Sequence, residues 1–314
     1  MSFIVRFFVA SVVLLSALPA SADTLGIASG YNVFVFGNMT LSNTDVEGRA
    51  AVGGNATFSS FGVGQSVAAN AGQLNLVVGG NAGLTNGQIF NGSGHAATST
   101  LTGVGLNTPG AAFTNGGASP VDFAAADVAL TGLSDSLQAL GTTGSFLSQP
   151  WGEWDLTGAN AALNVFSIDG SLLSTLNTFK IVAPTSSTIV INVSGAYASL
   201  ANMGMFLNGS QNTDWSRVIW NFYDATAIKA SSVGWGGSIL APDANIMFSN
   251  GQINGQVIAN SINSTGEFHN VAFAGTLPDS RSDTTPVPEP TSIVLLGLGL
   301  SGLSVRGRRW LRRR

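Results

Sequence analysis

The stretch Ala51-Val-Gly-Gly-Asn-Ala-Thr-Phe58 decides the fold, because it returns as Val77-Val-Gly-Gly-Asn-Ala-Gly-Leu84. Each copy reads as a short apolar strand, a turn of Gly and Asn, and a second short strand. Gly and Asn favour such turns because they adopt positive φ at little steric cost. A unit of this length cannot bury its apolar face alone, so it must stack on a similar unit. The repeat therefore predicts a β-solenoid.

A looser third copy lies far downstream. It reads Ile239-Leu-Ala-Pro-Asp-Ala-Asn-Ile-Met-Phe248 and continues as Ser249-Asn-Gly-Gln-Ile-Asn-Gly255, which matches Thr85-Asn-Gly-Gln-Ile-Phe-Asn-Gly92. Copies near both ends of the body predict one β-helix built from N- and C-terminal segments, with the middle of the chain as an excursion. The alternative is chance similarity within a chain rich in Gly and Asn.

The middle of the chain contains one predicted helix, over residues 121–140. Asp122 is placed to stabilise its N-terminus and Gly141 to end it. Its apolar residues recur three or four positions apart, at Phe123, Ala126, Leu130, Leu133 and Leu137. Further apolar runs predict strands over residues 164–168, 178–182, 188–193 and 218–222. The fold class is therefore mainly β, a β-solenoid-like body with one inserted α-helix and extra strands.

The C-terminal end has three consecutive parts. Val287-Pro-Glu-Pro290 is stiff and extended because proline fixes its own φ and restricts the preceding residue. An apolar run over 291–305 follows, and then Arg306-Gly-Arg-Arg-Trp-Leu-Arg-Arg-Arg314, which favours the cytoplasmic side. As a helix the apolar run would span about 22 Å, which is short against a hydrocarbon core of about 30 Å. This order suits a segment that resides in the membrane only transiently.

The layout resembles the PEP-CTERM sorting signal of Gram-negative bacteria, here over residues 288–314. The resemblance implies that an exosortase is the processing partner, acting at Pro288, Glu289 and Pro290. It also implies transient residence in the inner membrane and delivery to the cell surface or the exopolysaccharide matrix. The alternative is an ordinary C-terminal anchor.

The N-terminal end reads as a signal peptide over residues 1–22. Arg6 precedes an apolar run, and Ala20-Ser-Ala22 fits the small-residue cleavage pattern. Cleavage after Ala22 would leave a body over residues 23–278, joined to the sorting signal by a polar linker over 279–287.

Charge is distributed unevenly along the chain. Of the 12 basic residues, six lie in the C-terminal tail and Arg6 lies in the leader, whereas only Glu289 of the 16 acidic residues lies in the tail. The body is therefore strongly acidic, which argues against nucleic acid as a partner. The chain contains no cysteine, so disulfides and thiol catalysis are excluded.

The body resembles the choice-of-anchor A family, an adhesive domain of bacterial surface proteins. The resemblance implies surface display and adhesion, and it supplies no catalytic residues. The motifs that carry it are Tyr31-Asn-Val-Phe-Val-Phe-Gly-Asn-Met39, Asp45-Val-Glu-Gly48, Ala51-Val-Gly-Gly-Asn55, Gly237-Ser-Ile-Leu-Ala-Pro-Asp-Ala-Asn245, Gly251-Gln-Ile-Asn-Gly-Gln-Val-Ile-Ala259 and Gly266-Glu-Phe-His-Asn270.

No residue pattern indicates a metal, a cofactor or a catalytic centre. Glu267 and His269 would share one side of a strand, but two ligands are too few for a metal site. Asp243, Asn245 and Asn250 offer oxygen ligands without a calcium repeat, which favours turn-forming roles. No cofactor is expected.

Trp151 and Trp154 are candidates for a carbohydrate contact, because flat aromatic rings stack on sugars; the alternative is packing with satisfied indole N–H groups. Trp215, Trp220 and Trp235 are expected in the core. The sequence thus predicts a non-enzymatic surface or matrix protein that adheres to exopolysaccharide. One alternative is a carbohydrate-active enzyme using Glu153 or Asp155. Another is an ice- or mineral-binding protein, although no regular Thr-x-Thr ladder is visible in the sequence.

Overall fold

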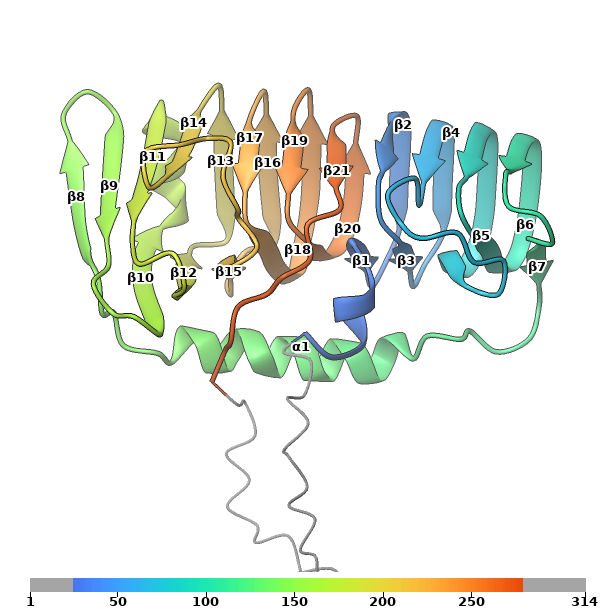
Figure 1. Ribbon diagram of the computed structural model, residues 1–314, viewed down its shortest axis with the longest axis horizontal. Helices are drawn as coiled ribbons and strands as arrows, with labels where there is room; N and C mark the ends of the chain where they lie inside the picture. The colour runs from blue at the N-terminus through green and yellow to red at the C-terminus, as the bar shows by residue number, and fades with distance from the viewer. Residues whose placement is uncertain (1–24, 279–314) are drawn as a thin grey trace, which may run out of the picture. The chain divides into compact units, whose positions relative to one another are not determined.

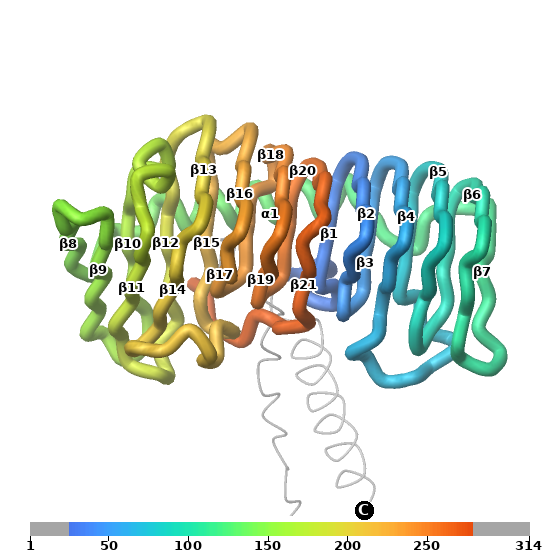
Figure 2. Tube along the Cα trace, turned by 90° about the horizontal axis from the view of Figure 1, so that it is seen from above, coloured from blue at the N-terminus to red at the C-terminus, as the bar shows by residue number. Residues whose placement is uncertain are grey.

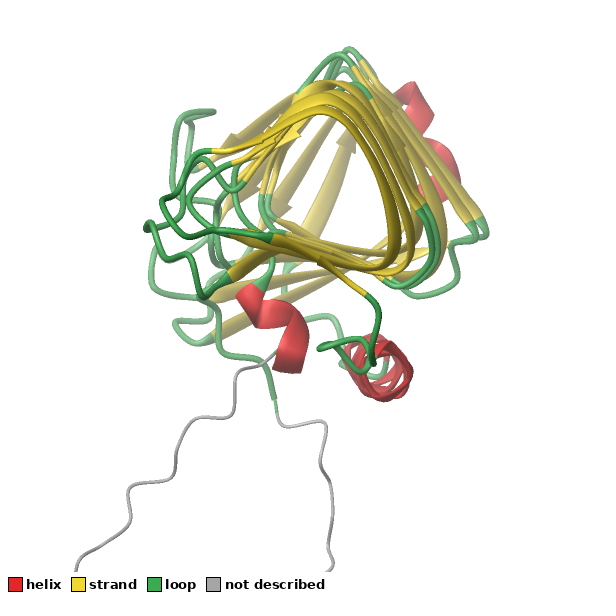
Figure 3. Cartoon of the chain, turned by 90° about the vertical axis from the view of Figure 1, so that its right-hand side faces the viewer, coloured by secondary structure: helices red, strands yellow, loops and turns green. Residues whose placement is uncertain are grey.

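The computed structural model describes residues 25–278, and these form a β-solenoid whose coils of strands surround a three-sided core (Figure 3). The predicted signal peptide, linker and sorting signal lie outside the described residues. Within residues 25–278 we find no helix with the length and apolarity needed to cross a membrane.

The first half of the body winds through strands that pair in parallel. They are preceded by a 3-10 helix, η1 (Gly26–Gly30). The strands are β1 (Val33–Val35), β2 (Met39–Val46), β3 (Ala50–Val52), β4 (Ala56–Val63), β5 (Leu74–Ile89), β6 (Ser93–Leu106) and β7 (Phe113–Asn115).

The second half follows the helix α1 (Phe123–Gln138) and includes a second 3-10 helix, η2 (Gly170–Thr175). Its strands are β8 (Ser145–Gln149), β9 (Glu153–Thr157), β10 (Leu163–Asp169), β11 (Thr178–Val182), β12 (Thr188–Ser194), β13 (Tyr197–Ala201), β14 (Gly204–Leu207), β15 (Val218–Phe222), β16 (Ala227–Ser231), β17 (Gly234–Gly236), β18 (Ser238–Ser249), β19 (Gln252–Asn254), β20 (Val257–Ser264) and β21 (Glu267–His269).

The chain enters this solenoid at its middle (Figures 1 and 2). It winds from β1 to β7 at one end, returns along the stack through α1, and winds back from β8 to β21. The two halves meet where β1 and β2 pair in parallel with β20. The predicted joining of N- and C-terminal segments is therefore confirmed.

The middle of the chain is not an excursion from the solenoid, and that part of the prediction was wrong. β12 pairs in parallel with β15, and β15 pairs in parallel with β18. The middle strands therefore continue the same 17-stranded sheet, while β8, β9, β11 and β14 form a 4-stranded sheet. Only α1 is inserted, and the middle strands stack as further coils; β12 and β15, which α1 covers, are buried on both faces.

The repeated Gly-Gly-Asn motif forms a corner at which successive coils approach closely. A Cβ built at Gly53 would lie 2.2 Å from the carbonyl oxygen of Phe36, and one at Gly79 would lie 2.4 Å from that of Gly53. The amide N–H of Asn55 donates to Asn38 Oδ1 at 2.8 Å, and that of Asn81 donates to Asn55 Oδ1 at 2.8 Å. Glycine is required for the close approach, and the Asn ladder satisfies the corner amides.

A second corner uses left-handed backbone. Asn86 and Asn250 have φ of 51° and 50°, so the two distant Asn-Gly-Gln-Ile copies occupy the same kind of corner. Asn43 and Ser60 adopt φ of 53° and 50° in the neighbouring coils. Asn tolerates this conformation better than most residues, which explains its recurrence.

Helix α1 covers one outer face of the solenoid. Asp122 caps it by accepting from the N–H of Ala125 at 3.0 Å, as its position predicted. Leu130, Leu133 and Leu137 are buried in a cluster that includes outward residues of the sheet such as Val190. Strands on this face are therefore covered on both sides, and they read as continuous apolar runs.

The interior of the solenoid is filled by apolar side chains. Trp215, Trp220 and Trp235 are at most 3 % exposed, so their predicted place in the core is confirmed. The joint between the two halves is closed by polar side chains as well. Gln256 Nε2 donates to the carbonyl of Tyr31 at 2.6 Å, and Asn32 Nδ2 donates to that of His269 at 2.9 Å.

Candidate functional site

Side chains with hydroxyl groups form two rows on an uncovered outer face of β2, β4, β5 and β6. Parallel pairing places Thr40, Thr57, Gly83 and Thr100 side by side in one row. The second row, two positions along each strand, contains Ser42, Ser59, Thr85 and Thr102. We call these two rows the hydroxyl face.

The hydroxyl face has a regular spacing, because strand geometry sets it. Neighbouring strands lie about 4.8 Å apart, and outward residues along one strand lie about 6.7 Å apart. Thr40, Thr57 and Thr100 are exposed, and Ser42 Oγ lies 3.3 Å from Ser59 Oγ. The face therefore offers an ordered array of hydroxyl and methyl groups without charge.

Sequence inspection missed this array. The copies of the strand pair are separated by unequal lengths, since the loop after β4 adds residues to one coil only. Their Thr and Ser residues thus align only after the coils are stacked. The available signal was a Thr followed two positions later by Ser or Thr, as in Thr57-Phe-Ser59 and Thr100-Leu-Thr102, although the β5 copy has Gly83 at the Thr position.

Beyond the β2–β20 pairing, on the C-terminal half of the solenoid, the same face carries other residue types. Met247 is paired with Asn263 on one side and with Lys229 on the other, and Met247 is 55 % exposed. Tyr197 is exposed further along. Ser231 and Ser249 pair on this half of the face, but Met247, Lys229 and Asn263 replace the hydroxyl residues of the other row, so the double row is confined to the N-terminal half.

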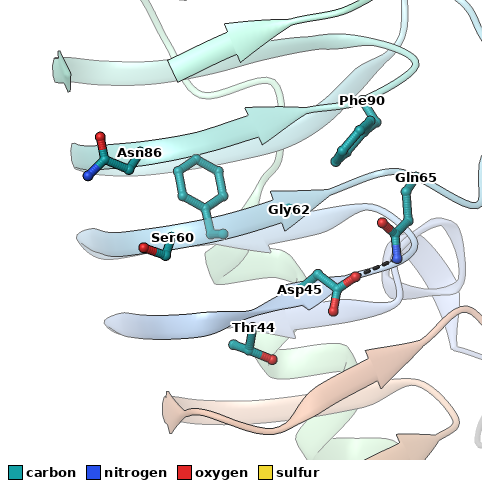
Figure 4. A pocket seen from close by; sticks show the side chains of 8 residues that line it. Thr44, Asp45, Ser60, Gly62, Gln65, Asn86 and Phe90 are labelled. Atoms are coloured by element: carbon teal, nitrogen blue, oxygen red, sulfur yellow. Dashed lines mark hydrogen bonds between the residues drawn. The ribbon is translucent and has the colours of Figure 1, made fainter. Parts of the chain in front are cut away.

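A shallow hollow of about 400 Å³ lies around the next corner (Figure 4). It forms because Gly62 has no side chain between Asp45 and the ring of Phe90. Gln65 Nε2 donates to Asp45 Oδ2, and Asn86 lies at the opposite rim. An aromatic edge with carboxylate and amide groups is chemistry that suits a sugar hydroxyl, so the hollow extends the polar surface beside the hydroxyl face.

The pKa of Asp45 is raised from its ordinary value, chiefly by burial. The charges of Glu267 and Glu47 raise it further, while the hydrogen bond from Gln65 lowers it. The carboxylates of Glu267 and Glu47 therefore act on the hollow beside Asp45, and their charge disfavours anionic groups there.

The two tryptophans considered as glycan contacts lie in different environments. Trp151 is 61 % exposed at the turn between β8 and β9. Trp154 is 4 % exposed, and its indole N–H donates to Ser148 Oγ at 3.1 Å. Trp154 therefore offers no ring face to a ligand, because it points into the core, and only Trp151 remains a candidate for glycan contact.

The carboxylates considered for catalysis are engaged in local contacts. Glu153 Oε2 lies 2.7 Å from Lys180 Nζ on the neighbouring strand. Asp155 Oδ2 accepts from Gln149 Nε2 at 3.2 Å. Both side chains therefore have structural partners on an open sheet surface.

Both histidines, and two of the residues considered as oxygen ligands, have structural partners. His95 Nδ1 lies 3.0 Å from Thr114 Oγ1, and His269 Nδ1 lies 2.9 Å from Asn254 Oδ1. Asn245 Nδ2 donates to the carbonyl of Thr226 at 3.2 Å, and Asn250 Nδ2 donates to Ser232 Oγ at 2.9 Å. In the part of the chain that the structure describes, no three His, Cys, Asp or Glu side chains group as a metal site would require.

Two families match this chain. The family described as "Putative Ice-binding-like adhesive domain" matches residues 24–270, which is most of the chain. The PEP-CTERM protein-sorting motif matches residues 286–309. The predicted sorting signal is thereby confirmed, and so is the resemblance of the body to an adhesive surface domain.

Solved ice-binding proteins are similar to this chain at low identity. One from the Antarctic ascomycete Antarctomyces psychrotrophicus is 15% identical, covering 80% of this chain and 98% of its own, with a TM-score of 0.36. One from an Antarctic biological consortium is 11% identical, covering 85% and 93%, with a TM-score of 0.31. One from an Antarctic Flavobacteriaceae bacterium is 15% identical, covering 74% and 75%, with a TM-score of 0.26. No curated protein matches.

Proposed function

Because the chain belongs to the ice-binding-like adhesive domain family and ends in a PEP-CTERM sorting motif, it is an exported surface protein, and we propose that it adheres to exopolysaccharide through its hydroxyl face. The observation that carries this proposal is the double row of Thr and Ser, interrupted only at Gly83, on β2, β4, β5 and β6. A polysaccharide presents repeated hydroxyl groups, and an ordered hydroxyl surface can engage many of them weakly at once.

Three properties of the face support a neutral, hydrated ligand. The rows contain no ionisable side chain, so binding does not depend on salt bridges. The rows lie on rigid strands whose inward neighbours, such as Phe58 and Leu84, are buried. The hydroxyls are therefore ordered before contact, which lowers the entropic cost of binding.

Replacing Thr57 with Tyr is expected to lower retention of the exported chain on the host's purified exopolysaccharide by about tenfold, or about 1.4 kcal/mol. The ring would stand above the centre of the hydroxyl face and keep neighbouring hydroxyls from the ligand. A co-sedimentation titration measures the change. Ser249→Tyr is the matched control, because Ser249 is an exposed outward residue on the other half of the same face. Equal loss in both variants, or loss in neither, would refute the assignment of the face.

Ice is a second candidate ligand, favoured by the two-dimensional regularity of the hydroxyl and methyl groups. The same pair of variants separates the candidates. Thermal hysteresis that is present in the wild type and lost in Thr57→Tyr would assign the face to ice. Retention on exopolysaccharide without thermal hysteresis would assign it to glycan. Trp151 is an additional proposed glycan contact, which Trp151→Ala would test in the same titration.

We propose further that an exosortase cleaves at or near Pro288, Glu289 and Pro290, and that a signal peptidase cleaves after Ala22. The mature body would then extend over residues 23–278 with a short linker, and it would reach the surface or matrix of a Gram-negative cell. Removal of the six tail arginines would leave an acidic, exported body.

Mass spectrometry of the mature termini tests this processing. The expected product begins at Asp23 and lacks the arginine cluster, whereas cells without the exosortase should retain it. A released protein that still contains Arg314 would contradict processing at this motif.

A further inference from the structure

The two ends of the solenoid are built differently. At the β8 end, β8 pairs antiparallel with β9, and η2 packs against β13. The chain before β8 also covers β10, because the N–H groups of Thr143 and Gly144 donate to the carbonyl of Val165 at 2.9 and 3.2 Å. The coil therefore ends here in an antiparallel edge strand, β8, which carries the exposed Phe146 and Leu147 and lies beside the charged Glu153 of β9.

The β6 end is open (Figure 3). β6 pairs with β5 along most of its length, but with β7 only at residues 94–96. Among residues 25–278, no strand pairs with the outer edge of β6 over residues 98–106. Leu101 is 39 % exposed there, although its inward neighbour Leu84 in the covered coil is 1 % exposed.

The stacking of the coils shows which way the backbone N–H and C=O groups of β6 point. Inward-facing residues donate their N–H toward the β6 end, as Met39 does to the carbonyl of Asn55 at 2.9 Å and Ile262 does to that of Asn38 at 3.1 Å. Ser99 and Leu101 stand in register with the buried residues Ala82 and Leu84. Their N–H and C=O groups therefore point away from β5, where a further strand would pair with them.

This open edge lacks the usual protection against pairing. Residues 50–121 contain no Asp, Glu, Lys or Arg, and residues 94–108 contain no Pro. Natural proteins protect exposed edges with charged side chains, Pro or covering segments. The acidic residues of this body all lie outside residues 50–121, so most other contacts between copies would bring like charges together.

We propose that the β6 end pairs with the β6 end of a second copy of this chain, forming a closed two-fold dimer. The two β6 edges would run antiparallel across the dyad, and each would cover the exposed Leu101 of the other. The dimer closes because the same patch is used on both copies. The β8 end differs, because its edge strand is antiparallel and lies beside charged residues of β9. If the hydroxyl face binds polysaccharide as proposed above, the dimer presents two such faces and gains avidity.

Single-cysteine cross-linking tests the two-fold, because the native chain contains no cysteine. The exported chain is prepared with Ser99→Cys, Thr100→Cys, Thr102→Cys or Gly105→Cys and then oxidised. A disulfide between identical positions forms only where the two copies face each other, so at least one variant should yield a covalent dimer. Thr57→Cys, on the same face but in the middle of the stack, should remain uncross-linked. Cross-linking at no edge position, or equally at Thr57, would overturn the proposal.

Sedimentation equilibrium tests the assembly without any ligand. The wild type and Thr57→Lys should be dimers. Leu101→Lys should weaken dimerisation at least tenfold, because a buried charge would face the partner's edge. Thr100→Lys, whose side chain points outward, provides a second edge variant if Leu101→Lys does not fold. A monomeric wild type, or assemblies larger than a dimer, would overturn the closed pairing. The mass is measured without polysaccharide, so this failure is distinct from loss of retention in Thr57→Tyr.

Discussion

Replacing Gly53 with Ala is expected to lower the Tm of the exported chain by roughly 5–10 °C, corresponding to about 3 kcal/mol. The added Cβ would lie 2.2 Å from the carbonyl oxygen of Phe36 and 3.1 Å from the ring of Phe123. The first neighbour is backbone, so a side-chain rotation cannot relieve the overlap. The adjoining coils must therefore move apart.

The neighbouring hydrogen bonds resist this movement. The N–H of Gly54 donates to the carbonyl of Gly37 at 2.8 Å, and that of Gly80 donates to the carbonyl of Gly54 at 2.9 Å. Separation at Gly53 would lengthen these bonds and the Asn ladder beside them. The cost therefore spreads over several coils, which is why a single methyl group has a large expected effect.

Gly132→Ala is the matched control, because Gly132 is exposed on α1 and a Cβ there would meet no atom within 4 Å. Ala is the better helix former, so this variant should be unchanged or more stable by up to about 1 kcal/mol. Differential scanning calorimetry measures both. A Gly53→Ala variant as stable as Gly132→Ala would show that the corner is not closely packed.

Replacing Asn221 with Ala is expected to cost about 3 kcal/mol and to loosen α1 from the sheet. Asn221 is fully buried, and its Nδ2 donates to the carbonyl of Ser134 and to Asn192 Oδ1, both at 2.9 Å. Ser134 Oγ donates to Asn221 Oδ1 at 2.6 Å, and Asn192 Nδ2 donates to the carbonyl of Leu137 at 2.6 Å. Truncation would leave buried groups on both the helix and the sheet without a partner.

Hydrogen exchange distinguishes this effect from a general loss of stability. The amides of α1 should exchange faster relative to those of β4 and β5, because the Asn221 hydrogen bonds that hold the helix on the sheet are removed. Ser136→Ala is the control, since Ser136 Oγ donates only within the helix, to the carbonyl of Gly132 at 2.8 Å. Equal protection of α1 in Asn221→Ala and Ser136→Ala would show that the Asn221 hydrogen bonds do not hold the helix on the sheet.

Several features were predictable from the sequence because their causes are local. The Gly-Gly-Asn and Asn-Gly-Gln-Ile copies predict corners, since close approach or left-handed backbone at each corner restricts the residue type. The apolar spacing from Phe123 to Leu137 and the cap at Asp122 predict α1 nearly to its ends. The order of Pro-Glu-Pro, apolar run and arginine cluster predicts the sorting signal, which the PEP-CTERM match confirms.

Other features depend on which coil stacks on which, and no local pattern encodes that. The sequence indicated an excursion where β10, β12 and β15 continue the solenoid. It also made Trp154 equivalent to Trp151, although only stacking shows which ring points inward. The hydroxyl face was missed for the same reason, since its residues come from coils of unequal length. The sequence by itself determined the corners of the solenoid coils, the helix α1 and the C-terminal sorting signal, because turn chemistry, periodicity and charge act over a few residues. The tertiary structure alone decided the hydroxyl face, the buried hydrogen bonds between α1 and the sheet, and the open β6 end, because parallel register aligns residues that the chain keeps far apart.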